Sequence, residues 1–225
     1  MDKPNNKPNI TVVFSDLEGT LLDEEFGKLD AKEFRTLVKN FDVFSKKTNT
    51  QIIFVIVSPV EQEFMAPLLE QIEDEFFKFN SENGTTYKIE LAACYKPHKQ
   101  DEYSNNMANN ILPMLDHNAG KRRVVDWLTD SLGYRFNIQN TIYMGNGAND
   151  IDAINFLQGK YKDHSYTICP LNSKSRLRTN RRCVIGNGVD IHGINDGFSQ
   201  VLSSLEQSTN ISTKIAHDND DVQSL

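Results

Sequence analysis

Acidic, amide and glycine residues gather in two short stretches of the chain, each directly after an apolar run. The first contains Asp16, Glu18, Gly19 and Thr20, and the second is GNGAND at residues 145–150. Carboxylates can act as nucleophiles, exchange protons and, together with amide oxygens, bind a divalent cation. The two stretches therefore combine residue types that a metal-assisted group-transfer site requires.

Ser58 and Lys121 stand at comparable places in the chain. Ser58 follows the apolar run 51–57, and Lys121 opens a segment with helical periodicity. A serine hydroxyl can hydrogen-bond a phosphate oxygen, and a lysine can supply positive charge to a phosphoryl group and to Asp16. Singly, each residue is as typical of a helix start, a cap or a solvated face. Their order after successive apolar elements favours a functional site.

The elements that would position these residues alternate between apolar strands and amphipathic helices. Short, nearly continuous apolar strands are typical of strands buried on both faces. The alternation predicts a parallel sheet covered by helices on both faces, in which ligands bind beyond the carboxyl ends of the strands. We expect strands at residues 10–15, 51–57, 87–94, 141–145, 165–170 and 183–186, and helices at 30–47, 60–79, 120–133, after the GNGAND loop and within 190–205.

These motifs resemble those of the haloacid dehalogenase (HAD) superfamily in their order and in their placement after strands. SDLEGTLLD resembles motif I (DxDGT), Ser58 motif II, Lys121 motif III and GNGANDIDAI motif IV (GDGxNDxxM), over about residues 10–205. The segments NGTTY and DGFSQVL resemble the Cof-like (type II) phosphatases. The resemblance implies an α/β, HAD-type Rossmann-like sheet sandwiched by helices, and a Mg²⁺-dependent phosphatase that forms an aspartyl-phosphate.

The resemblance also implies a role for each matching residue. Asp16 is the nucleophile, Glu18 the general acid and then the base, and Lys121 the catalytic cation. The residues implied to bind the substrate phosphate are Ser58, Gly19, Thr20 and Asn149. The residues implied to bind Mg²⁺ are Asp16, Glu18 through its backbone carbonyl, Asn146 and Asp150.

Two residues depart from the family pattern. Glu18 stands where most of these phosphatases have Asp, and its extra methylene moves the acid by about 1.5 Å. Family members with DxEGT motifs are active, so this change is tolerated. Asn146 stands where the family's Asp binds Mg²⁺, and an amide adds no negative charge, so metal affinity should fall or Asp150 must compensate. The alternative function is therefore a HAD-like binding or scaffold protein with weakened catalysis.

A small insert at about residues 95–118, between motifs II and III, would act as a reduced cap. It is much smaller than the cap of Cof-type sugar phosphatases, so the site would accept larger substrates or be closed by another subunit. By analogy the substrate is a small phosphorylated metabolite such as a sugar phosphate. A phosphomutase is a weaker alternative, because mutases need a fuller cap to exclude water.

Bulk properties restrict the partners. The chain has 225 residues and a formal net charge of -7, which argues against a nucleic-acid partner. It has no apolar run of about 20 residues, so no membrane span is expected. Cys94, Cys169 and Cys183 stand far apart, which favours reduced thiols and a cytoplasmic protein. The oligomeric state is left open.

One core domain is expected at residues 10–205, after a flexible N-terminus (1–9) and before a disordered polar tail (206–225). The basic segment 173–182, which includes Arg176 and Arg182, has two interpretations. It could bind an anion, or it could be an exposed loop that balances an acidic protein, and we favour the second.

Overall fold

The centre of the fold is a six-stranded parallel sheet, seen in a computed structural model that describes residues 7–23, 27–58, 62–85, 87–89, 120–178, 180 and 183–222. The strand order is β3-β2-β1-β4-β5-β6, so the chain builds outward from β1 in one direction and then crosses to β4 on the other side. The order therefore reverses between β1 and β4. The strands are β1 (Asn9–Ser15), β2 (Gln51–Ile56), β3 (Lys88–Ile89), β4 (Asn137–Met144), β5 (Ser165–Cys169) and β6 (Cys183–Ile185).

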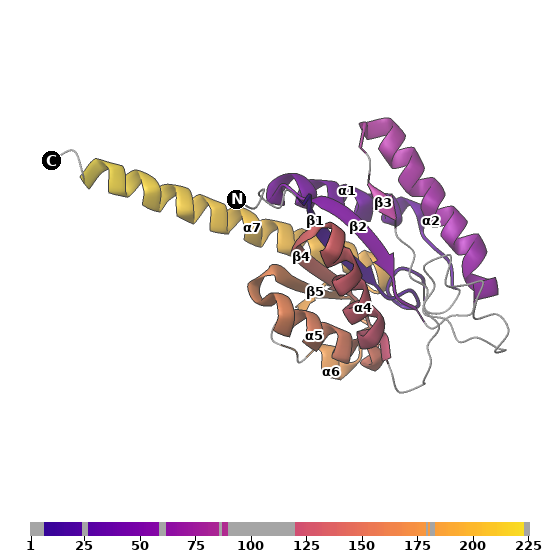
Figure 1. Cartoon of the computed structure of the whole chain (residues 1–225). Helices are drawn as coiled ribbons and strands as arrows, with labels where there is room; N and C mark the ends of the chain where they lie inside the picture. Colours follow the sequence, from indigo (N-terminus) through magenta and orange to yellow (C-terminus); the bar gives the residue numbers. More distant parts are fainter. Residues whose placement is uncertain are drawn as a thin grey trace.

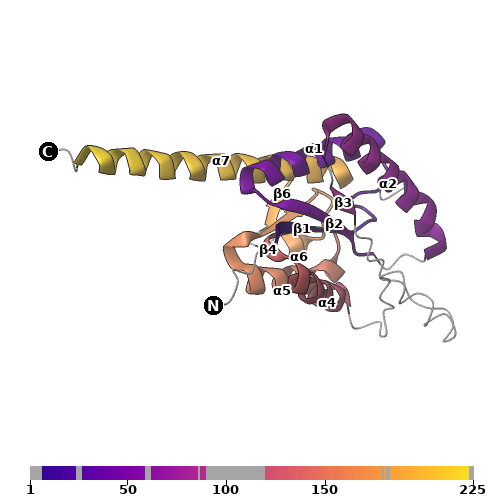
Figure 2. The same cartoon turned by 45° about the horizontal axis from the view of Figure 1, so that its top comes forward.

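Helices cover both faces of this sheet, as Figures 1 and 2 show. The predicted α/β fold with a parallel sheet between two helical layers is confirmed. Among the described helices, none has the length and apolar character needed to cross a membrane. One face carries α1 (Ala31–Thr48), α2 (Gln62–Asn83) and α7 (Asp190–Val222), and the other carries α4 (Gly120–Arg135), α5 (Ile151–Tyr161) and α6 (Ser175–Arg178), with short 3-10 turns η3 (Ala148–Asp150) and η4 (Lys162–His164).

Side chains of β1 alternate between the two faces and so join two separate cores. Val13 packs in the core beneath α1, α2 and α7, while Val12 and Phe14 pack in the core beneath α4 and α5. The first core is unusually aromatic, with rings from α1, β2, α2 and α7 in mutual contact. These two cores fix the direction of β1, and hence the place where its carboxyl end delivers Asp16.

Helix α1 shows how local sequence sets an element. Asp30 caps its start by accepting the N–H groups of Lys32 and Glu33, at 3.0 and 3.1 Å. Asn49 ends it in the left-handed conformation at φ 51°, which Asn adopts more readily than most residues. Apolar residues spaced by three or four face the sheet, as predicted, and they are Phe34, Leu37, Val38, Phe41 and Phe44.

One helix boundary needs correction, and the structure adds detail near both ends of the chain. The chain is held from residue 7, because Lys7 Nζ donates to the Gly133 carbonyl at 2.8 Å and the Pro8 carbonyl accepts from Asn137. Helix α4 continues past Gly133 to Arg135. Helix α7 continues to Val222, where a disordered tail was predicted; no Gly or Pro interrupts residues 206–222. The predicted insert at 95–118 lies outside the described residues.

The expectation of three separate thiols is also wrong. Cys169 ends β5 and Cys183 begins β6, and the two are paired in a disulfide with Cα atoms 6.6 Å apart. Their separation of 14 positions hides the fact that β5 and β6 are hydrogen-bonded neighbours. A disulfide between Cys169 and Cys183 removes the reason to expect a reducing compartment from the cysteines. Cys94 lies outside the described residues.

Candidate active site

The predicted site residues lie at the carboxyl ends of the central strands, where the strand order reverses. The N–H of Asp16 donates to the carbonyl of Met144, the last residue of β4, at 2.8 Å. The N–H of Val57 likewise donates to Ser15 at 2.7 Å, so Ser58 follows β2 beside the end of β1. Ligands bind at this kind of switch point in open parallel sheets.

Lys121 brings the first and fourth motifs together. Its Nζ lies 2.6 Å from Asp16 Oδ1 and 2.7 Å from Asp150 Oδ1. All three residues are nearly inaccessible, at 6% exposure for Asp16, 2% for Lys121 and 0% for Asp150. The ammonium group comes from the first turn of α4, so this helix start is what holds the two carboxylates on one cation. Buried charges of this kind persist only when they are paired.

Asp150 is held by three donors. Besides Lys121, the hydroxyl of Tyr143 donates to Oδ1 at 2.8 Å and the N–H of Gly147 donates to Oδ2 at 2.8 Å. Tyr143 was not among the predicted site residues. It lies in the predicted strand at 141–145, and its buried hydroxyl, which requires a partner, was the available signal.

Burial and charge set the protonation of this group. Burial, with the nearby Asp150 carboxylate, raises the pKa of Asp16 to about 6, although Lys121 and the Leu17 N–H oppose the shift. Burial acts to lower the pKa of Lys121, but Asp150 and Asp16 outweigh it and the net shift is upward. Lys121 is therefore a permanent cation, and Asp16 is ionised at neutral pH.

The turn after β1 is compact. The carbonyl of Leu17 accepts from the N–H groups of Leu21 and Leu22, at 2.9 and 3.0 Å. Gly19 has φ +65°, which strains any other residue, and a Cβ there would lie 2.0 Å from Asn146 Nδ2 and displace that side chain. The side chain of Glu18 is exposed, whereas Thr20 is buried and its Oγ1 has no hydrogen-bond partner among the described residues.

Ser58 and Asn149, the other predicted phosphate ligands, differ in exposure. Ser58 is fully buried, two residues after the end of β2. Asn149 is exposed in η3, and its Oδ1 lies so close over Gly147 that a Cβ on Gly147 would be 2.2 Å away. Their proposed contacts with phosphate stay predictions.

The loop after β5 also reaches this site, although none of its residues was predicted to do so. Nδ2 of Asn172 donates to the Gly19 carbonyl at 3.2 Å and to Asp190 Oδ1 at 2.8 Å. The N–H of Lys174 donates to the Asn146 carbonyl at 2.9 Å. The rule that polar residues after strands form the site, applied to the strand predicted at 165–170, would have found Asn172.

The basic segment is described only in part. Arg176 and Arg178 belong to α6 and are exposed, while Arg181 and Arg182 lie outside the described residues. Leu177, between the two, is buried against α4 and α5. The segment is thus anchored by one apolar residue, and its anion-binding role stays a prediction.

Oxygen atoms at and near Asp16 are the candidate ligands of the predicted Mg²⁺. Both side-chain contacts of Asp16 among the described residues use Oδ1, so Oδ2 is the oxygen available to a ligand. The side-chain amide of Asn146 lies against Gly19. The described residues contain no group of three or more His, Cys, Asp or Glu side chains arranged to hold a metal. A carboxylate, an amide and a backbone carbonyl suit a hard cation that keeps several waters, but with low negative charge.

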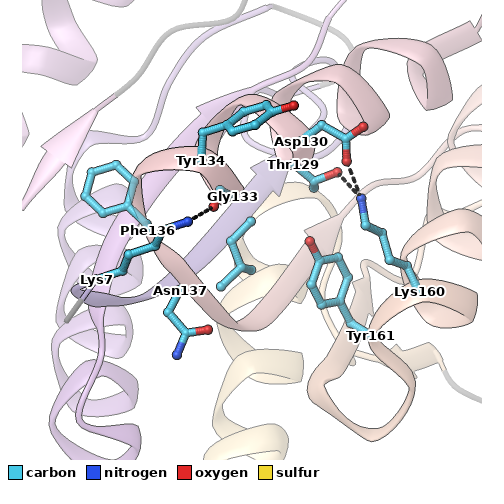
Figure 3. Close-up of a pocket in the computed structure, with 10 residues that line it drawn as sticks. Lys7, Thr129, Asp130, Gly133, Tyr134, Phe136, Asn137, Lys160 and Tyr161 are labelled. Carbon is cyan, nitrogen blue, oxygen red and sulfur yellow. Dashed lines mark hydrogen bonds and ion pairs between the residues drawn. The ribbon is translucent and has the colours of Figure 1, made fainter. Parts of the chain in front are cut away.

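A groove lies at the opposite edge of the sheet (Figure 3). It has a volume of about 610 Å³ and is lined by the ends of α4 and α5 and the start of β4. Its cations are already paired, Lys7 with the Gly133 carbonyl and Lys160 with Asp130 and Thr129. None of the predicted site residues lines it.

No family model matches the chain, and no curated protein matches it. Solved structures similar to it include yhjK, a haloacid dehalogenase-like hydrolase protein from Bacillus subtilis (11% identity, 87% of this chain and 90% of that chain, TM-score 0.48). A second is BT1666 from Bacteroides thetaiotaomicron, described among phosphatases of the HAD superfamily, with 12% identity over 91% of this chain and 98% of that chain and a TM-score of 0.47. A third is D,D-heptose 1,7-bisphosphate phosphatase from B. bronchiseptica, complexed with magnesium and phosphate, with 8% identity over 87% of this chain and 99% of that chain and a TM-score of 0.47. These values describe a shared arrangement of elements, and nothing about chemistry follows from them.

Proposed function

We propose that this chain is a Mg²⁺-dependent phosphomonoester hydrolase of the HAD type, with Asp16 as its nucleophile and a small phosphorylated metabolite, such as a sugar phosphate, as its substrate. The observation that carries the proposal is the buried trio of Asp16, Lys121 and Asp150 at the switch point of the sheet. An ion pair with no function would ordinarily lie on the surface, because burying its charges is costly. A reactive carboxylate that a cation orients gives a reason for this burial.

The geometry suits each half of the reaction. In the first, Asp16 Oδ2 attacks phosphorus, and the ester oxygen leaves with a proton from Glu18, giving an aspartyl-phosphate and an alcohol. In the second, water attacks the same phosphorus and gives its proton to Glu18, which releases inorganic phosphate and restores the Asp16 carboxylate. Glu18 is exposed and Asp16 is not, which suits an acid that meets the leaving group and a shielded nucleophile.

The remaining residues have supporting roles in this proposal. Lys121 orients Asp16 through Oδ1 and adds positive charge beside the transferred group. Mg²⁺, when bound, neutralises phosphoryl charge, and Asp16, the Glu18 carbonyl and Asn146 would hold it. Asp150 Oδ1 accepts from Lys121 and Tyr143, whereas Oδ2 accepts only from the Gly147 N–H among the described residues, so Asp150 suits both the task of holding Lys121 and that of a metal ligand through Oδ2.

Phosphate release from an aryl phosphate tests the proposal. With Mg²⁺ present, Asp16→Asn should lower the rate by at least about 1,000-fold, because a neutral amide cannot form the acyl phosphate. Asp74→Asn, an exposed acid on α2, serves as the matched control and should keep the wild-type rate. Equal rates in Asp16→Asn and the wild type would remove Asp16 from the mechanism.

Asn146 favours a second candidate, a HAD-like binding or scaffold protein with weakened catalysis. The same assay separates the two when Asn146→Asp is added to it. An added carboxylate should tighten Mg²⁺ binding, measured by calorimetry, by about tenfold. No turnover by the wild type, with turnover in Asn146→Asp, would favour the second candidate. No change in metal affinity would show that residue 146 is not a ligand.

A further inference from the structure

Asn172 joins three loops at the rim of the site through its side-chain amide. Its Nδ2 donates to the Gly19 carbonyl at 3.2 Å and to Asp190 Oδ1 at 2.8 Å, and its Oδ1 accepts from the Asp190 N–H at 3.1 Å. A primary amide has two N–H donors and one carbonyl acceptor, so a flipped amide would turn its oxygen toward two other acceptors. The three bonds therefore fix one orientation of Asn172.

Asp190 is built to hold this orientation. It begins α7, is 8% exposed, and has φ +47°, a left-handed conformation that costs energy for most residues but that Asp and Asn tolerate. Its backbone N–H and its carboxylate both bind Asn172. Strained backbone of this kind persists where the surroundings determine it, and it gathers at functional sites.

Gly19 is the residue on which this arrangement acts. Its N–H donates to the Leu22 carbonyl at 3.0 Å, and its own carbonyl is held by Asn172. Because the peptide unit is planar, the first bond orients the Glu18 carbonyl and the second orients the peptide that follows. Glycine has more backbone conformational freedom than any other residue type. These two hydrogen bonds therefore restrict a turn that would otherwise be flexible at Gly19.

We propose that Asn172 is a positioning residue, which Asp190 holds and which acts through the Gly19 carbonyl on the turn that carries Asp16 and Glu18. The proposal rests on the function inferred above, because the placement of this turn affects a rate only if Asp16 and Glu18 react. Asn172 makes no contact with the reacting atoms in this account. Its effect is on the geometry of attack and of proton transfer.

Kinetics of Asn172→Ala with an aryl phosphate and Mg²⁺ give the first test. We expect kcat to fall by about tenfold or more with KM within about threefold, because sub-ångström misplacement of reacting groups lowers kcat. Asp190→Asn keeps an acceptor for the Asn172 amide and suits the left-handed backbone, so it should keep at least about half of the wild-type kcat. An unchanged kcat in Asn172→Ala would overturn the proposal.

The exchanged pair, Asn172→Asp with Asp190→Asn, separates positioning from stability. Residue 190 then donates to residue 172, so the pair and the free energy of unfolding should recover relative to Asn172→Asp alone. An aspartate at 172 has no N–H for the Gly19 carbonyl, so kcat should stay low. Recovery of kcat together with stability would mean that the pair is only structural, and would overturn the proposal.

Asn187→Ala is the matched control. Asn187 also binds an aspartate near the start of α7, through Nδ2 to Asp196 Oδ2 at 3.0 Å, but it is exposed, and among the described residues its hydrogen bonds go to Asp196 and not to the turn. This variant should keep the wild-type kcat. A loss equal to that of Asn172→Ala would show that any disturbance of this region lowers the rate, and would overturn the specific role of Asn172.

Hydrogen exchange gives a readout that does not depend on activity. The amides of Gly19, Leu21 and Leu22 close the turn, and they should exchange faster in Asn172→Ala than in the wild type. Unchanged exchange would overturn the proposal even if kcat fell. If the wild type releases no phosphate beyond Asp16→Asn, the proposed function fails, while faster exchange would still support the control of the turn by Asn172.

Discussion

Asp16 is placed at a cost to the stability of the fold. Its carboxylate is nearly buried, it lies near Asp150, and Lys121 compensates for these effects only in part, so its pKa is raised from 3.8 to about 6. In the metal-free protein the folded state therefore retains a proton between about pH 4 and 6 that the unfolded chain has released. The stability from that proton is complete below about pH 4 and is lost as the pH rises through about 6.

Replacing Asp16 should accordingly stabilise the protein while removing activity. At pH 7.5 with a chelator, Asp16→Asn should raise the free energy of unfolding by about 2–3 kcal/mol, since each pKa unit corresponds to about 1.4 kcal/mol. The gain should shrink toward zero near pH 4. Urea unfolding of both proteins at several pH values measures it. A less stable variant at pH 7.5 would mean that the ion pair with Lys121 outweighs the cost of burial.

Site residues were predicted where polar residues that follow an apolar strand were taken as candidates, and they were missed where this rule was not applied. Asp16, Lys121 and Asp150 have the order and types that the rule selects, and they do converge. Tyr143 and Asn172 act through one hydroxyl and one amide, and these residue types are common in strands and loops without any such role. The position of Asn172 after a predicted strand could have marked it as a candidate, but its bond to Gly19, like the bond of Tyr143 to Asp150, depends on distances that no local pattern contains.

At the scale of elements, periodicity predicted the helices and strands well and their ends poorly. The apolar face of α1 follows from spacing alone, whereas α4 passes Gly133 because a glycine ends a helix only when the chain then turns. The pairing of β5 with β6 is a property of the sheet. Because the two cysteines are 14 positions apart, their closeness in space could not be predicted without knowing that β5 and β6 are neighbours.

The aromatic core ties the elements on one face together, and Phe41 is at its centre. The centroid of its ring lies 5.4 Å from that of Phe54 on β2, 6.4 Å from that of Phe76 on α2 and 5.5 Å from that of Phe198 on α7. Phe41→Ala should lower the free energy of unfolding by about 3–5 kcal/mol, because it leaves a cavity among rings from three other elements. Val43→Ala, on the exposed side of α1 (38% exposed), should change it by less than about 1 kcal/mol. Urea unfolding compares them, and similar losses in both would mean that the helix responds as a unit and that the ring contacts add little.

At the scale of the whole molecule, the reversal of strand order places the site. Because β1 has β2 on one side and β4 on the other, loops from both halves of the sheet meet at its carboxyl end. Asn172 and Asp190 add the loop after β5 and the start of α7 to the same place. The groove at the amino end of β4 lacks this convergence, which explains why chemistry-bearing residues gather at one edge only.

The long C-terminal helix gives the last prediction. Among the residues of α7 whose side chains the structure describes, Leu205 packs against the core and Glu206 Oε1 lies 2.7 Å from Lys47 Nζ, and Figures 1 and 2 show the later turns of the helix extending away from the sheet. A helix without packing is marginal in water. Truncation after residue 207 should therefore change the free energy of unfolding by less than about 1 kcal/mol, leave phosphate release unchanged and lower helical circular dichroism. Urea unfolding and sedimentation of the truncated and full chains check this. The prediction would be contradicted by a larger loss of stability, or by a fall in the sedimentation mass greater than the mass of the removed residues. Either result would indicate that these turns pack against a second copy of the chain.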